Sequence, residues 1–99
     1  MIVVTATMTV DPEHTEAFLA AASRVIESTL ADEPGCHAYA CSRDITDPTR
    51  FVFVEEWEDM AAIGAHVQSP HYAAFKEVGD VVLRDQAVKL HTVEKTRVL

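Results

Sequence analysis

The sequence contains few glycines and cysteines, and each shortage excludes a class of site. Only three glycines occur in 99 residues and none are clustered, so the chain has no glycine-rich phosphate-binding loop. The two cysteines, Cys36 and Cys41, lie on an expected strand at an odd separation, so they point to opposite faces and cannot form a disulfide within the chain. Two isolated thiols are neither a secreted disulfide framework nor a spaced pair of metal ligands. We expect both to be inert, small apolar side chains.

Basic residues are also scarce. Eight lysines and arginines stand against sixteen aspartates and glutamates, which gives a formal net charge of −8. A chain this acidic lacks the positive potential that attracts nucleic acids and anionic lipid surfaces. No apolar run approaches the roughly 18 residues of a membrane-spanning helix, and residues 1–5 do not resemble the basic start of a signal peptide. We therefore expect a cytoplasmic protein with no nucleic-acid or membrane partner.

Four segments have the alternation, or the β-branched and aromatic content, that is typical of strands. These segments are residues 2–10, 36–43, 50–57 and 86–98. The third segment is apolar on both faces for most of its length, which indicates a sheet covered on both sides.

Signals typical of helix starts follow the first and third of these strands. Asp11-Pro12 begins a helix that Pro34-Gly35 ends, Asp59 can cap a short second helix, and Ser69-Pro70 begins a third. The order β-α-β-β-α-β is the ferredoxin-like, split β-α-β pattern of an α+β protein. We expect a single domain over residues 1–99, with helices on one face of an antiparallel sheet. The other face is too apolar for water, which predicts a homodimer packed sheet against sheet.

Titratable side chains occur beside aromatic residues in the second half of the chain. Glu55 shares a strand face with Phe53 and Trp57, and His66 lies on the apolar side of the short helix. By pattern alone, a histidine in this position is more often a core residue that is hydrogen-bonded to a carboxylate. The functional alternative is a general base that Glu55 orients and that faces a slot lined by rings.

A metal site is a weaker alternative for the same region. His66 and His71 are five positions apart across a break at Pro70, whereas two ligands on one helix face are separated by four. With Glu55 they could still hold an ion. We expect neither a metal nor any other cofactor.

The remaining candidates also have two interpretations. His37 and Tyr39 share a strand face, and by themselves they are ordinary strand residues. Tyr72 and Phe75 occur in a helical pattern, which more often marks a core than a substrate platform.

Three segments follow one another along the chain: Glu33-Pro-Gly-Cys-His-Ala-Tyr-Ala40 followed by Asp47-Pro48, Phe51-Val-Phe-Val-Glu-Glu-Trp-Glu58, and Ala65-His-Val-Gln-Ser-Pro-His-Tyr72. In this order and spacing they resemble the antibiotic biosynthesis monooxygenase superfamily, and within it the small bacterial quinol monooxygenases. The resemblance covers essentially the whole chain. It implies a dimeric α+β barrel that oxygenates quinols or polyketide aromatics without metal or flavin.

A haem-degrading branch of this superfamily is disfavoured. Its asparagine, catalytic tryptophan and haem-ligating histidine would fall at Ala6, His66 and Lys76, and none of the three matches. The branch that acts on autoinducer sugars shares the segment Ser69–Tyr72, so that chemistry stays open.

The resulting hypothesis is a cofactor-independent monooxygenase that oxidises a small electron-rich aromatic to a quinone with O₂. In it, His66 removes a phenolic proton, Glu55 orients the imidazole, and Trp57 stacks on the substrate ring. The expected substrate-binding residues are His37, Tyr39, Phe53, His71, Tyr72 and Phe75. Two alternatives remain: a non-catalytic dimer that binds an aromatic metabolite, and an isomerase or lactone-processing enzyme in which the same histidine and glutamate move protons.

Overall fold

Strand β1, Ile2–Val10, runs through the middle of an antiparallel sheet, and its sequence explains why. Its even-numbered residues are buried and its odd-numbered residues are half-buried, as the alternation predicts. It pairs with β3, Arg50–Trp57, on one side and with β4, Leu83–Thr92, on the other. Strand β2, Cys36–Arg43, pairs with β3, so the order is β2-β3-β1-β4. The computed structural model describes all residues from Met1 to Leu99.

The last strand differs from the predicted segment, residues 86–98. It begins at Leu83, because the chain passes directly from the end of a helix at Val82 into the strand. It ends at Thr92, which lies opposite Ile2, the first residue of β1, and one further backbone hydrogen bond runs from the N–H of Val93 to the carbonyl of Met1. The other three strands have the predicted bounds.

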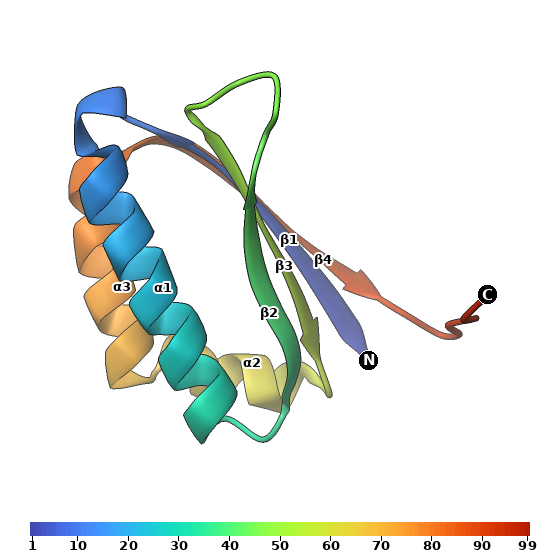
Figure 1. Ribbon diagram of the computed structural model, residues 1–99. Helices are drawn as coiled ribbons and strands as arrows, with labels where there is room; N and C mark the ends of the chain where they lie inside the picture. Colours follow the sequence, from blue (N-terminus) through green and yellow to red (C-terminus); the bar gives the residue numbers. More distant parts are fainter.

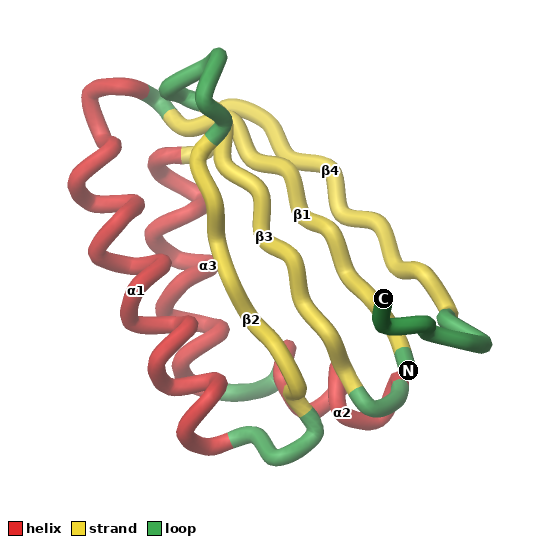
Figure 2. The backbone as a smooth tube through the Cα atoms, turned by 45° about the vertical axis from the view of Figure 1, so that its right-hand side comes forward, coloured by secondary structure: helices red, strands yellow, loops and turns green.

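All the helices lie on one face of the sheet (Figures 1 and 2). They are the 3₁₀ turn Pro12–His14, α1 at Thr15–Asp32, α2 at Met60–Val67 and α3 at Pro70–Val82. The side chains of Asp11, Asp59 and Ser69 each accept a hydrogen bond from a backbone N–H two or three residues on, so the three predicted helix starts are confirmed. Helices α1 and α3 lie side by side along the sheet, and α2 lies near one of its ends (Figure 2). None of the helices has the length and apolar character needed to cross a membrane.

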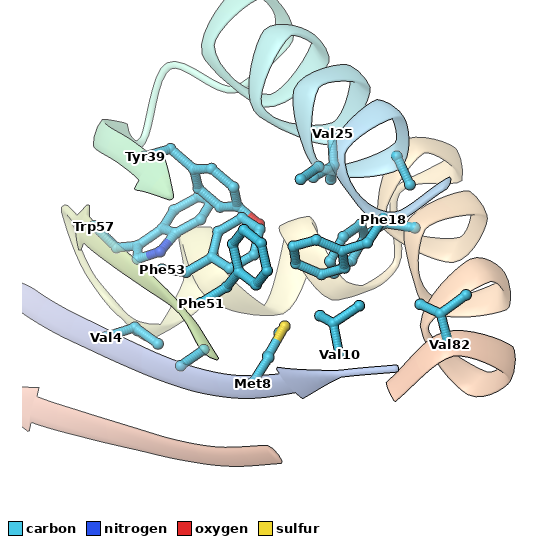
Figure 3. Packing of buried hydrophobic residues seen from close by; sticks show 14 of the residues in the cluster. Val4, Met8, Val10, Phe18, Val25, Tyr39, Phe51, Phe53, Trp57 and Val82 are labelled. Carbon is cyan, nitrogen blue, oxygen red and sulfur yellow. The ribbon is translucent and has the colours of Figure 1, made fainter. Parts of the chain in front are cut away.

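Aromatic rings fill the core between the sheet and the helices (Figure 3). The ring of Phe18, from α1, lies 4.8 Å from that of Phe51 on β3, and Phe53 lies 5.5 Å from Phe75 on α3. Because alternate residues of β3 point to this face, Glu55 is also directed into the interior. The same packing that stabilises the sheet thus brings a carboxyl group among the rings.

The opposite face of the sheet has no helix over it (Figure 2). Val54, on β3, is 44% exposed there, and Val52, Thr5 and Thr7 beside it are half-buried. The sheet therefore has the uncovered, partly apolar face on which the predicted homodimer depends.

Candidate active site

A cavity of about 460 Å³ lies between the inner face of the sheet and helices α2 and α3. This volume is typical of sites for small molecules. Its walls are mainly apolar and include Phe53, Tyr72 and Phe75, so the structure brings these predicted substrate-binding residues together. Three further candidates, Tyr39, Glu55 and His66, supply titratable groups to the same wall.

The imidazole of His66 is held at both nitrogens. The residue lies in the last turn of α2 and is only 3% exposed. Its Nδ1 lies 2.7 Å from Oε2 of Glu33, and its Nε2 lies 3.4 Å from the hydroxyl of Tyr39. The carboxylate of Glu33 accepts a hydrogen bond from Nδ1–H of the neutral ring. Nε2 then carries no proton, so it is the nitrogen that can accept one, and it lies beside Tyr39 in the cavity wall. His66 is therefore both a buried histidine bonded to a carboxylate and a candidate general base.

The prediction that Glu55 orients His66 is wrong, because Glu33 does so. Glu33 directly follows α1, and its hydrogen bond to His66 joins the end of this helix to α2. The approach is so tight that a Cβ on Gly35 would lie 2.6 Å from the Cβ of Ala62. One sequence signal could have identified Glu33: an acidic residue at the carboxyl end of a helix opposes the helix dipole, so a functional reason for it should be sought.

Glu33 also holds a second histidine. Its Oε2 lies 2.6 Å from Nε2 of His71, in the first turn of α3. His71 does not line the cavity, and its role in binding substrate oxygens stays a prediction. The donor atoms of Glu33, His66 and His71 lie within 4.8 Å of one another, a grouping that can hold a metal ion. Glu33 thus has the role predicted for Glu55, that of orienting His66.

Glu55 is oriented by Trp57 instead. The indole Nε1–H donates a 2.9 Å hydrogen bond to Oε1 of Glu55, two residues away on the same strand face. Trp57 is fully buried and does not line the cavity, and its stacking on a substrate ring stays a prediction. Its ring packs against His66, with centroids 4.7 Å apart. Burial raises the pKa of Glu55 above its usual value, and the hydrogen bond from Trp57 offsets part of this rise.

Glu55→Gln is expected to raise the melting temperature more at about pH 8 than at about pH 4. Because burial raises the pKa of Glu55 on folding, the folded chain binds this proton more tightly than the unfolded chain. The stability that this proton contributes is fully present below the pKa of Glu55 in the unfolded chain. It is lost as the pH rises through the higher pKa of Glu55 in the folded chain. The amide avoids this loss and still accepts the bond from Trp57. Thermal unfolding of both proteins at the two pH values is the measurement, and equal differences in melting temperature would contradict the expectation.

Burial keeps one hydroxyl and two thiols of strand β2 protonated. Burial, reinforced by the charge of Glu55, raises the pKa of the Tyr39 hydroxyl far above its usual value, so Tyr39 acts as a hydrogen-bond donor. Burial also raises the pKa of the Cys36 and Cys41 thiols to about 11. Both cysteines are free thiols, and a raised pKa disfavours the reactive thiolate, in line with the expectation that they are inert.

His37 is the predicted site residue that lies furthest from this arrangement. The pairing of β2 with β3 shifts register between Cys36 and Ala38, so His37 is an extra residue with no partner across the ladder. Its side chain is exposed and does not line the cavity. The contact of His37 with substrate oxygens stays a prediction, and the bulge explains why its side chain is exposed.

Comparisons with known proteins agree on one family. The family model of antibiotic biosynthesis monooxygenases matches residues 1–78. The Escherichia coli protein named "Probable quinol monooxygenase YgiN" is 34% identical over an alignment of 79 positions that covers 70% of this chain and 75% of that protein. A Synechocystis protein, sll1783, is 32% identical over an alignment of 99 positions that covers 99% of this chain and 67% of its own length. The crystal structure of an antibiotic biosynthesis monooxygenase superposes with a TM-score of 0.88 at 32% identity, covering 96% of this chain and 100% of that one.

Proposed function

This chain belongs to the antibiotic biosynthesis monooxygenase family, and on that premise we propose that it oxidises a small electron-rich aromatic to a quinone with O₂, without a metal or flavin cofactor. The observation that carries the proposal is His66, whose Nδ1 is bonded to Glu33 and whose Nε2 borders a cavity walled by rings. The name of the Escherichia coli relative supports a quinol, or a related dihydroxyaromatic, as the substrate.

The substrate of such a reaction can supply all the electrons. O₂ is a triplet and reacts slowly with closed-shell molecules until one electron is transferred to it, and a phenolate transfers an electron more readily than a phenol does. When one oxygen atom enters the ring and two hydrogen atoms leave, a dihydroxyaromatic becomes a hydroxyquinone and the second oxygen atom becomes water. The tasks left to the protein are to remove a proton, to stabilise the anion and to exclude water.

Each task has a residue at the polar end of the cavity. Nε2 of His66 accepts the phenolic proton, and the carboxylate of Glu33 stabilises the imidazolium that forms. The hydroxyl of Tyr39, which stays protonated, donates to the phenolate oxygen. Glu55, oriented by Trp57, is placed to hydrogen-bond a second substrate oxygen.

The apolar walls fit the flat face of an aromatic substrate. Phe53 and Phe75 pack edge to face, with ring centroids 5.5 Å apart, and together form part of the cavity wall. At the β4 side, Val88 and Leu90 line the cavity and are 54% and 47% exposed, which gives the cavity an apolar entrance. Such walls keep water from the reactive anion and the radical pair.

Oxygen uptake by metal-free and flavin-free protein tests the proposal. With a panel of naphthohydroquinones and benzohydroquinones, we expect uptake well above the autoxidation of each quinol, with one O₂ consumed for each hydroxyquinone formed. The stoichiometry matters because simple two-electron oxidation would release hydrogen peroxide, so added catalase should not change the uptake.

Two other outcomes would overturn the proposal in favour of the alternatives. A quinol that binds, as measured by quenching of the Trp57 fluorescence, but is consumed no faster than by autoxidation would indicate a binding protein. Conversion of a related ligand without any use of O₂ would indicate an isomerase or a lactone-processing enzyme, in which the same base moves protons.

We also propose that the chain is a homodimer packed through the uncovered face of its sheet. The exposed Val54 and its half-buried neighbours Val52 and Thr5 form the centre of that face. Light scattering coupled to size exclusion should give twice the mass of the chain. Val54→Lys should reduce that mass, whereas Leu19→Lys, on an equally exposed residue of α1, should not.

A further inference from the structure

Three side chains from the ends of three helices share one small space beside the cavity. Glu33 directly follows α1, His66 lies in the last turn of α2, and His71 lies in the first turn of α3. A single carboxylate oxygen, Oε2 of Glu33, lies 2.7 Å from Nδ1 of His66 and 2.6 Å from Nε2 of His71. The proposed oxidation uses the first of these contacts and gives the second no role.

The donor set is that of a transition-metal site. Two imidazole nitrogens and one carboxylate oxygen form a common protein ligand set for Zn²⁺ and similar divalent ions, with water in the fourth position. Bonds of about 2.0–2.1 Å in a tetrahedral site place the donor atoms about 3.3 Å apart. The carboxylate–imidazole contacts therefore need to widen by about 0.6 Å, and the two imidazole nitrogens, now within 4.8 Å of each other, need to close to the same spacing.

The cluster is also accessible and has a free ligand atom. The side chains of Glu33 and His71 are 13% and 14% exposed, so an ion can enter from solvent without passing through the cavity. The second carboxylate oxygen of Glu33, Oε1, has no hydrogen-bond partner in the protein. Tyr39 contacts Nε2 of His66, and such outer contacts orient ligating histidines. The net charge of −8 further favours a cation.

We propose that Glu33, His66 and His71 bind one divalent ion with the chemistry of Zn²⁺, and that the bound ion inhibits the oxidation. The ion replaces the two imidazole protons that now form the hydrogen bonds to Glu33. A neutral imidazole that gives Nδ1 to a metal carries its proton on Nε2. His66 then has no free nitrogen with which to accept a proton from the substrate. The binding site stands without the proposed function, whereas the inhibition rests on it.

Isothermal titration calorimetry of the tag-free protein with Zn²⁺ tests the site. We expect one ion per chain, and His71→Gln should weaken binding by more than about 10-fold. Glutamine can still donate a hydrogen bond to Glu33, so the variant should keep its fold, which its circular dichroism verifies. His91→Gln, on an exposed histidine of β4, is the matched control and should bind like the parent protein. Co²⁺ should give the visible absorption of a tetrahedral site in the parent protein and not in His71→Gln.

The site is overturned if the parent protein binds no Zn²⁺, or if His71→Gln binds it as tightly as the parent protein. The inhibition has its own readout, because quinol-dependent O₂ uptake should fall along the Zn²⁺ binding curve and His71→Gln should lose this sensitivity. Uptake that persists at full occupancy would contradict the inhibition alone. If the metal-free protein shows no uptake at all, the proposed function fails, while the titration still decides the site.

Discussion

His66→Ala is expected to lower kcat for quinol oxidation by about 10²–10⁴-fold, the usual contribution of a positioned general base. This loss corresponds to about 3–5 kcal/mol of transition-state stabilisation. The physical reason is that His66 supplies the only imidazole of the cavity wall, held at Nδ1 by Glu33, while the neighbouring Tyr39 stays protonated. Steady-state O₂ uptake at saturating quinol is the measurement.

The controls separate chemistry from folding. After removal of the imidazole of His66, Glu33 keeps its bond to His71, so no buried carboxylate is left without a partner. Glu33→Gln keeps an oxygen that can accept from Nδ1 but removes the charge that stabilises the imidazolium, so its kcat should fall between those of the parent protein and His66→Ala. His14→Ala, on an exposed histidine next to α1, should have no effect. A His66→Ala protein that turns over at the parent rate would refute the assignment of the base.

The residues of the site divide into two hydrogen-bonded pairs with different roles. Glu33 and His66 join the ends of two helices, so their geometry depends on how α1, α2 and the loop at Gly35 pack together. Glu55 and Trp57 lie on one strand, so their geometry depends only on the pleat of β3. The base is therefore set by tertiary packing, and the neighbouring carboxyl group is set by local structure.

This difference explains how much the sequence could predict. Strands 2–10, 36–43 and 50–57 have the predicted bounds because side-chain alternation is a local property. The caps at Asp59 and Ser69 are local as well. The extent of the last strand is not local, because it depends on the pairing with β1 across the sheet.

The same rule applies to the candidate site. The placement of Phe53 and Glu55 on the inner face follows from strand parity, and the structure confirms it. Spacing along the chain could not pair His66 with Glu33, since Glu33 is 33 positions away and comes near only through the path of a loop. The exposure of His37 could not be predicted, because a bulge leaves no clear mark in the sequence.

Trp57→Phe is expected to lower the free energy of unfolding by about 2–4 kcal/mol, from two additive causes. The indole is fully buried between Tyr39 and His66, so the smaller ring leaves a gap that its neighbours fill only in part. Phenylalanine also has no N–H, so it leaves the buried carboxyl of Glu55 without its donor. Urea denaturation at neutral pH measures the loss.

A double-mutant cycle separates the two causes. In a Glu55→Met background there is no carboxyl group to leave without a donor, so the same Trp57→Phe change should cost only the loss of packing. The double variant should then be more stable than the sum of the two single losses predicts. Strictly additive losses would mean that the bond between Trp57 and Glu55 contributes nothing. The indole would then act through its volume alone, and the orientation of Glu55 in the cavity would need another cause.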